Sequence, residues 1–166
     1  MQRTLIALAV CGLLSACSST PEKAAEAPAS KATAGAAAET DAQKMDRIVK
    51  LLASKSIYFD YDNYSIKPEY QAALKQDFDL LNSAPGLALR VEGNADERGS
   101  TEYNLALGQK RAEAVRRALV MLGVPDARLE AVSYGKEKPR ATCHEEKCWA
   151  EDRRVDFARK TLEASR

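Results

Sequence analysis

Residues 91–111 read VEGNADERGSTEYNLALGQKR, and this stretch predicts a strand, a short polar loop and the start of a helix. Leu87, Leu89 and Val91 alternate with more polar residues, which is the period of two typical of a half-buried strand. Ser100 is a suitable N-cap residue for the helix that follows the loop. The loop is therefore expected to be held at both ends by regular structure.

The helix is predicted to run from about Thr101 to Leu122, because Gly123 and then Pro125 are typical of a helix end. Apolar residues at helical spacing predict the side that faces the core. This expected core stripe comprises Leu105, Ala112, Val115, Leu119 and Leu122.

Three side chains of the same helix suggest a binding site. Asn104, Leu107 and Arg111 are separated by steps of three and four residues, so they share one face. Arg111 is expected to lean toward the loop that carries Asp96, since helical side chains tilt toward the N-terminus. This carboxylate and guanidinium suit a target that has both an ammonium and a carboxylate group. Spacing alone also permits an internal Asp96–Arg111 pair or two unrelated solvated charges.

The remaining segments alternate between predicted helices and predicted strands. Helices are expected from about residue 42, from Lys67-Pro68 and near residues 145–152, and strands at 57–60, 129–134 and 155–157. The alternation predicts one α+β domain over residues 42–162, with a small mixed β-sheet and helices packed on one face.

The N-terminal residues 1–16 have the pattern of a lipoprotein signal peptide. Arg3 supplies a positive charge, and residues 5–14 form an apolar run that is too short to span a bilayer. Leu14-Ser15-Ala16-Cys17 looks like a lipobox, in which Cys17 is lipidated and becomes the mature N-terminus. The alternatives are an ordinary signal peptide cut after Ala16 and a transmembrane anchor.

A disordered tether is expected over residues 17–41, after the lipidated cysteine. The segment is rich in Ala, Pro, Glu and Lys and lacks large apolar residues, so it cannot bury enough surface to fold. As a random coil it would span on the order of 25–30 Å, which lets an anchored domain search a nearby polymer layer.

Composition argues against two broad functions. The chain has 25 basic and 24 acidic residues, so no basic excess indicates nucleic-acid binding. Its single histidine, His144, is distant in sequence from the proposed site, and no nucleophile–base–orienting set is visible. An enzyme is therefore not expected, and no cofactor is predicted.

Two thiols, Cys143 and Cys148, remain once Cys11 leaves with the signal peptide and Cys17 takes lipid. In an oxidising periplasm these two are expected to form a disulfide. Because His144 lies between them, a metal site is the alternative, although two thiols and one imidazole give incomplete coordination.

Three separated motifs occur in order along the chain: GNADERGSTEYNLALGQKRAEAV, VSYGKEKP and DRRVDF. They closely resemble the peptidoglycan-associated lipoproteins, a family of domains like the C-terminal half of outer-membrane protein A. The resemblance runs from about Ile57 to Phe157 and implies a site for the peptide stem of peptidoglycan, through its diaminopimelate. The ligand contacts that it implies, position by position, are Asp96, Arg111, Asn104, Leu107, Asp62, Tyr61 and Arg98. We expect replacement of Asp96 or Arg111 by alanine to remove most binding and to leave the fold intact.

Two positions depart from the pattern of that family. Asn94 stands where the family usually has histidine, and Asp152 stands where it prefers asparagine. Asp152 is expected to pair with Arg153 or Arg154, and these two arginines remain open between structural pairing and ligand contact.

The resemblance also implies a cellular role. It implies a lipid-anchored protein on the periplasmic face of the outer membrane of a Gram-negative bacterium, which tethers that membrane to the wall. It further implies docking to TolB and membership of the Tol system, which works in envelope constriction during cell division. The alternatives are a wall-binding lipoprotein of a different envelope machine, such as a secretion or motility complex, and a wall hydrolase.

Overall fold

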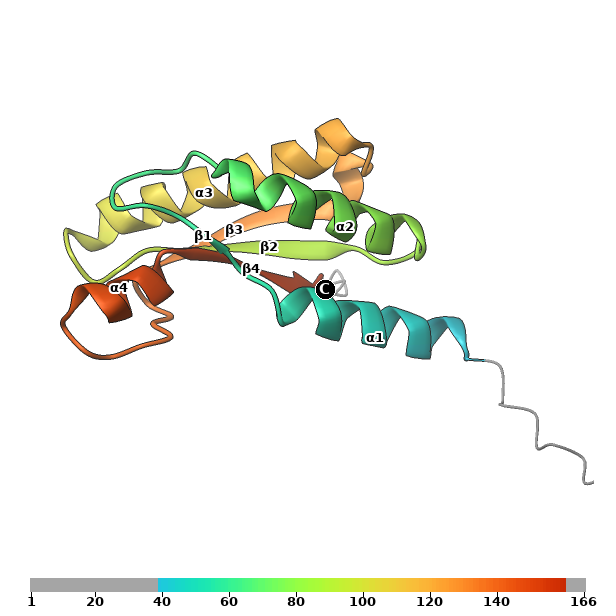
Figure 1. Cartoon of the computed structure of the whole chain (residues 1–166), viewed down its shortest axis with the longest axis horizontal. Coiled ribbons are helices and arrows are strands. Elements are labelled where there is room, and N and C mark those ends of the chain that lie inside the picture. Colours follow the sequence, from blue (N-terminus) through green and yellow to red (C-terminus); the bar gives the residue numbers. More distant parts are fainter. Residues whose placement is uncertain (1–38, 161–166) are drawn as a thin grey trace, which may run out of the picture. The chain divides into compact units, whose positions relative to one another are not determined.

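The computed structural model describes residues 39–160, and Figure 1 shows their arrangement. The expected signal peptide, the lipidated Cys17 and nearly all of the tether lie outside these residues. Four strands form one sheet in the order β1-β4-β2-β3. The helices and 3-10 turns are α1 (Asp41–Ala53), η1 (Pro68–Tyr70), α2 (Gln71–Asn82), α3 (Thr101–Leu122), η2 (Asp126–Arg128) and α4 (Glu146–Asp152). The strands are β1 (Ile57–Tyr58), β2 (Leu89–Asn94), β3 (Leu129–Gly135) and β4 (Arg154–Arg159).

The sheet is mixed, as the sequence predicted. Strand β2 pairs in parallel with β3 and antiparallel with β4, and β4 pairs antiparallel with β1. Helices α2 and α3 lie side by side over this sheet, and α1 packs against β4 (Figure 1). The expected α+β class is confirmed. No helix within residues 39–160 is long and apolar enough to cross a membrane.

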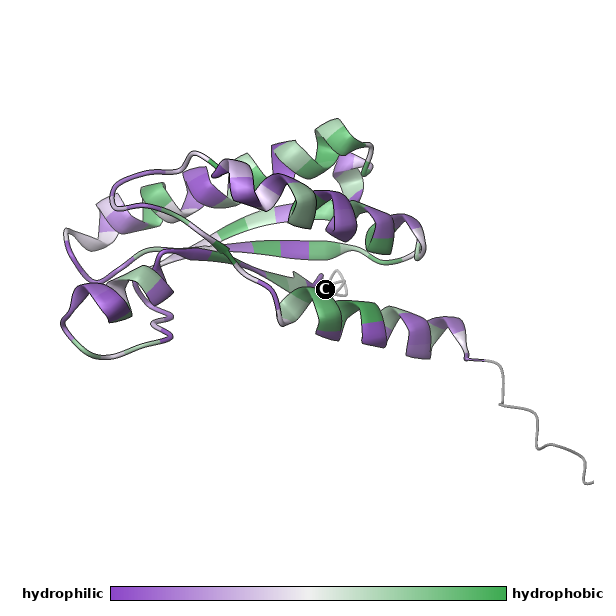
Figure 2. Cartoon of the chain, viewed as in Figure 1, coloured by the Kyte–Doolittle hydropathy of each residue, from purple (hydrophilic) through white to green (hydrophobic). Residues whose placement is uncertain are grey.

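One apolar cluster joins the first three helices to one face of the sheet. Figure 2 shows hydrophobic and hydrophilic residues alternating along β2 in the middle of the sheet and a mixed pattern on each helix, as expected for a sheet with one apolar face and for amphipathic helices. Fully buried members include Ile48, Leu52, Leu74, Leu81, Leu89, Val91, Val115, Leu119 and Val155. The other face of the sheet carries charged side chains, including Arg154 and Asp156, which pair with each other at 2.8 Å.

Helix α3 begins and ends where the sequence predicted. The Ser100 hydroxyl accepts a hydrogen bond from the backbone N–H of Tyr103 at 3.1 Å, and Gly123 ends the helix in the left-handed region with a φ of 116°. The prediction that Leu105 and Leu122 belong to the core stripe is wrong, because Leu105 is 48 % exposed and Leu122 is 39 % exposed. Leu105 lies about 100° around the helix from the buried Asn104, and Leu122 is the last helical residue.

Glycines bring α3 into backbone contact with the sheet. A Cβ atom added to Gly93 on β2 would overlap the carbonyl of Gly108, and one added to Gly108 would overlap the hydroxyl of Ser133 on β3. This close approach places the first half of α3 directly over the ends of the two parallel strands. The side chains of Asn104, Leu107 and Arg111 are buried on that face.

Candidate functional site

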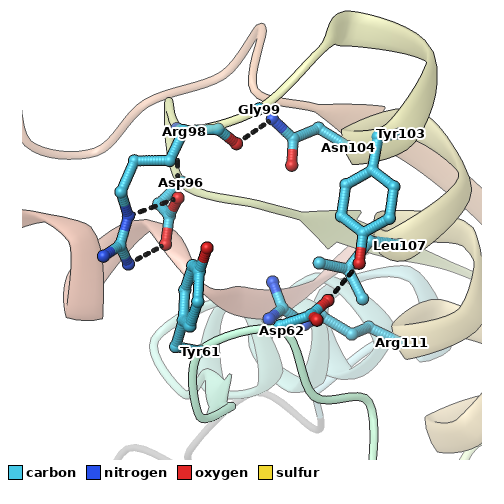
Figure 3. A pocket seen from close by; sticks show the side chains of 9 residues that line it. All are labelled: Tyr61, Asp62, Asp96, Arg98, Gly99, Tyr103, Asn104, Leu107 and Arg111. Atoms are coloured by element: carbon cyan, nitrogen blue, oxygen red, sulfur yellow. Dashed lines mark hydrogen bonds and ion pairs between the residues drawn. The ribbon is translucent and has the colours of Figure 1, made fainter.

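A cavity of about 260 Å³ opens at the end of the sheet beside the first half of α3. Figure 3 shows its lining side chains. They are Tyr61, Asp62, Asp96, Arg98, Gly99, Tyr103, Asn104, Leu107 and Arg111. All seven residues expected as ligand contacts therefore line one cavity, together with Gly99 and Tyr103.

Three segments far apart in the sequence supply the lining. Tyr61 and Asp62 follow β1, the residues from Asp96 to Gly99 form the loop between β2 and α3, and the others project from α3. Strand β4 lies between β1 and β2, so one strand separates the segment after β1 from the loop after β2. The cavity is thus a product of the sheet order and of the contact between α3 and β2.

Arg111 is the most deeply buried charged residue of the cavity, at 0 % exposed. Its guanidinium donates to the carbonyl oxygens of Asn63 at 2.8 Å, Asn94 at 2.9 Å and Asp60 at 3.0 Å. Burial, together with the nearby positive charge of Arg153, lowers the pKa of Arg111 to about 10. The side chain therefore joins α3 to β2 and to the loop after β1, and it stays cationic at neutral pH.

The contacts of Arg111 argue against part of the sequence-based expectation for this residue. We expected its removal to leave the fold intact, whereas its loss would leave three backbone carbonyls without their donor. The alternative of an internal Asp96–Arg111 ion pair is also wrong, because the carboxylate of Asp96 pairs with Arg98 and Arg153 instead. Three hydrogen bonds engage three of the five N–H groups of the guanidinium, so two of them have no hydrogen-bond partner among the described residues.

Asp96 is a strongly hydrogen-bonded acceptor and is 4 % exposed. Its carboxylate accepts from the backbone N–H of Arg98 at 3.1 Å and from the guanidinium of Arg98 at 3.1 and 2.7 Å. Arg153 donates a fourth hydrogen bond at 3.3 Å. Burial acts to raise the pKa of Asp96, but the hydrogen bonds from Arg98 and Arg153 outweigh it and hold that pKa below its ordinary value. Asp96 therefore remains an anion.

The guanidinium of Arg98 is also stacked between two aromatic rings. It lies 4.1 Å from the ring centre of Tyr61 and 4.1 Å from that of Trp149. Trp149, on α4, was missed by the sequence-based reasoning. No local pattern indicates it, because α3, η2 and β3 lie between the loop and α4 along the chain.

Further contacts shape the mouth of the cavity. The Tyr103 hydroxyl donates to the carboxylate of Asp62, and this bond raises the pKa of Tyr103. Asp62 itself lies in the left-handed region, with a φ of 50°. The side-chain amide of Asn104 donates to the carbonyl of Arg98 at 2.8 Å, so it holds the loop in shape, and its own oxygen points into the cavity (Figure 3).

The two departures from the family pattern lie behind the cavity. The Asn94 amide donates to the carbonyl of Glu92 at 3.1 Å, while its backbone carbonyl receives Arg111. Asp152 accepts from the backbone N–H of Arg140 at 2.6 Å and lies 3.7 Å from Arg154. Of the two partners expected for Asp152, the structure therefore shows Arg154.

Both neighbouring arginines have structural partners. Arg153 donates to the carbonyl of Phe59 at 3.1 Å as well as to Asp96, and Arg154 pairs with Asp156. Neither is among the lining residues of the cavity. The contacts therefore favour structural pairing for both.

Cys143 and Cys148 form a disulfide in the structure, with Cα atoms 5.6 Å apart. His144, between them, is exposed, and its Nδ1 lies 2.7 Å from the carboxylate of Glu97. The described residues contain no group of three or more His, Cys, Asp or Glu side chains placed to hold a metal ion.

Comparison with known proteins gives consistent matches. The model of the OmpA family matches residues 58–153. The peptidoglycan-associated lipoprotein of Pseudomonas putida is 42% identical over 154 residues, which is 92% of each chain. The protein of that name from Pseudomonas aeruginosa is 50% identical over 107 residues, and the match spans 64% of this chain and 63% of the relative.

Solved structures agree on the fold. The crystal structure of the peptidoglycan-associated lipoprotein from Burkholderia pseudomallei has a TM-score of 0.62 and 57% sequence identity, and covers 64% of this chain and 90% of that chain. The C-terminal domain of Helicobacter pylori MotB has a TM-score of 0.60 at 20% identity, covering 66% of this chain and 86% of that chain. The second likeness concerns the fold alone.

Proposed function

The chain belongs to the OmpA family, and from that premise we propose that its folded domain binds the peptide stem of peptidoglycan non-covalently in the cavity beside α3. One observation carries the proposal: the seven residues expected as ligand contacts, from three distant segments, line the same cavity. The names of the relatives, peptidoglycan-associated lipoproteins, support this assignment.

The ligand group is the free end of diaminopimelate, which carries an ammonium and a carboxylate. In Figure 3 the side chains form a ring, with Asp96 and Arg98 on one side and Asp62, Tyr103 and Arg111 on the other. The ammonium binds toward the carboxylates of Asp96 and Asp62, and the carboxylate binds toward the free N–H groups of Arg111 and Arg98.

The remaining lining residues complete the contact surface. Leu107, at 8 % exposed, packs under the methylenes of the ligand, and the ring of Tyr61 covers its open side. Asn104 accepts a hydrogen bond through its side-chain oxygen. A cavity already shaped by internal hydrogen bonds binds without a large ordering cost.

We further propose that Cys17 carries lipid and that residues 17–41 tether the domain to the periplasmic face of the outer membrane. Anchoring raises the local concentration of the domain at the wall, so modest binding suffices to hold membrane and wall together. The proposed machine is the Tol system in cell division, with TolB as a partner. A pull-down from periplasm with this protein as bait tests the partnership with TolB. If TolB is not recovered although the bait is well expressed, the result favours a different envelope machine.

The test of wall binding compares two kinds of purified sacculi in a co-sedimentation assay with the full chain in detergent. Walls whose stem carries diaminopimelate should retain the protein. Walls with lysine at that position lack the terminal carboxylate and should retain it at least about tenfold less, since a charge-assisted contact is worth about 1.5–3 kcal/mol. Equal retention on both walls would contradict the proposed ligand.

Variants test the acidic side of the cavity without removing the buried Arg111. Asp62→Asn and Asp96→Asn keep the side-chain shape and remove the charge, so both should weaken retention on diaminopimelate walls. Asp60→Asn is the matched control, because Asp60 is exposed, lies two residues from Asp62 and does not line the cavity. Thermal unfolding of each variant separates lost binding from lost structure.

A further inference from the structure

The guanidinium of Arg98 is held on four sides, and three of the contacts come from outside its own loop. Tyr61 and Trp149 each place a ring face 4.1 Å from it, Asp96 accepts two of its hydrogen bonds, and Glu146 lies 3.7 Å away. The Arg98 side chain is still 30% exposed, and a partly exposed arginine can adopt many conformations. The four contacts hold it in one of them.

Trp149 is itself fixed from two directions. Its indole N–H donates to the carboxylate of Glu97 at 2.8 Å, so it holds the loop residue next to Arg98. Along the chain it directly follows Cys148, whose disulfide with Cys143 closes the turn that leads into α4. One aromatic residue thus joins α4 to two consecutive residues of the loop that lines the cavity.

We propose that Trp149 is a positioning residue of the binding cavity, which acts by stacking on Arg98 and holding that guanidinium against Asp96. This inference rests on the proposed wall binding. Trp149 does not line the cavity, so its effect on a ligand passes through Arg98. A planar guanidinium stacks on an aromatic face while its edge N–H groups remain available for hydrogen bonds, so stacking orients Arg98 toward the cavity without consuming its donors.

The test measures retention of the full chain, in detergent, on sacculi that contain diaminopimelate. Trp149→Ala should weaken binding about three- to tenfold, and Trp149→Leu, which fills the space without an aromatic face, should weaken it similarly. Trp149→Phe loses the N–H and the second ring of the indole but keeps an aromatic face for Arg98, so it should bind within about twofold of the unchanged protein. His144→Ala is the matched control, because His144 also contacts Glu97 but does not touch Arg98.

A double-mutant cycle separates positioning from general stability. Arg98→Ala should weaken binding, and adding Trp149→Ala to it should cause no further loss, since the two act through one contact. If Trp149→Ala does not fold, Trp149→Leu takes its place in the cycle.

The proposal is overturned if Trp149→Leu binds like the unchanged protein, or if its effect is undiminished in the Arg98→Ala background. It is also overturned if Arg98→Ala alone leaves binding unchanged. Failure of the unchanged protein to bind sacculi is a different result, because it removes the proposed function itself.

Discussion

At the scale of single residues, Arg111 combines a structural task with the binding task proposed for it. Its three hydrogen bonds to backbone carbonyls fix the groups around the cavity, and its remaining N–H groups give the cavity a positive charge. We expect Arg111→Lys to lower the free energy of unfolding by about 2–4 kcal/mol, because one ammonium cannot reach three separate acceptors. Urea denaturation measures the change. Arg117→Lys, on the exposed side of the same helix, should change it by less than about 0.5 kcal/mol, and equal effects would contradict this role.

His144 gives a second prediction at this scale. The hydrogen bond with Glu97 raises the pKa of His144, and the bonds from His144 and Trp149 lower that of Glu97. The stabilisation from His144 is complete below its unfolded pKa and is lost as pH rises through its folded pKa. The stabilisation from Glu97 is present above the unfolded pKa of Glu97 and is lost as pH falls through its folded pKa. Both side chains are therefore charged at mildly acidic pH.

An NMR titration measures this directly, since His144 is the single histidine of the chain. Its pKa should lie above the ordinary value and return to that value in Glu97→Gln. An unchanged titration in that variant would show that the Glu97 contact does not hold His144 in solution.

At the scale of elements, the contact of α3 with β2 and β3 decides whether the cavity exists. Alanine normally improves a helix relative to glycine by about 1 kcal/mol, but a Cβ atom on Gly108 would lie 2.9 Å from the backbone oxygen of Gly93. We therefore expect Gly108→Ala to destabilise the fold by about 1–3 kcal/mol in urea denaturation. Gly86→Ala is the control, because its nearest contact would be Met45 at 3.9 Å. A stabilised Gly108→Ala would mean that α3 can move outward at little cost.

At the scale of the whole molecule, the last strand in sequence occupies an inner position in the sheet. Strand β4 lies between β1 and β2, and it buries Val155 and Phe157 in the shared core. We expect a chain that ends at Arg153 to lose cooperative unfolding in urea, because β1 then has no partner strand in the sheet. A chain that ends at Lys160 should keep its transition, and a sharp transition in the shorter chain would contradict this interpretation.

The sequence by itself determined the order of the helices and strands and both limits of α3. The alternation around Leu89 and the caps of α3 at Ser100 and Gly123 act over a few neighbouring residues, so they can be read without a structure. The candidate cavity was reached through family resemblance, since spacing left the roles of Asp96 and Arg111 open. Only the tertiary structure decided the partners of Arg111 and the stacking of Trp149 on Arg98. These contacts join segments dozens of residues apart, and the strand order and the packing of α3 against the sheet determine which of those segments meet.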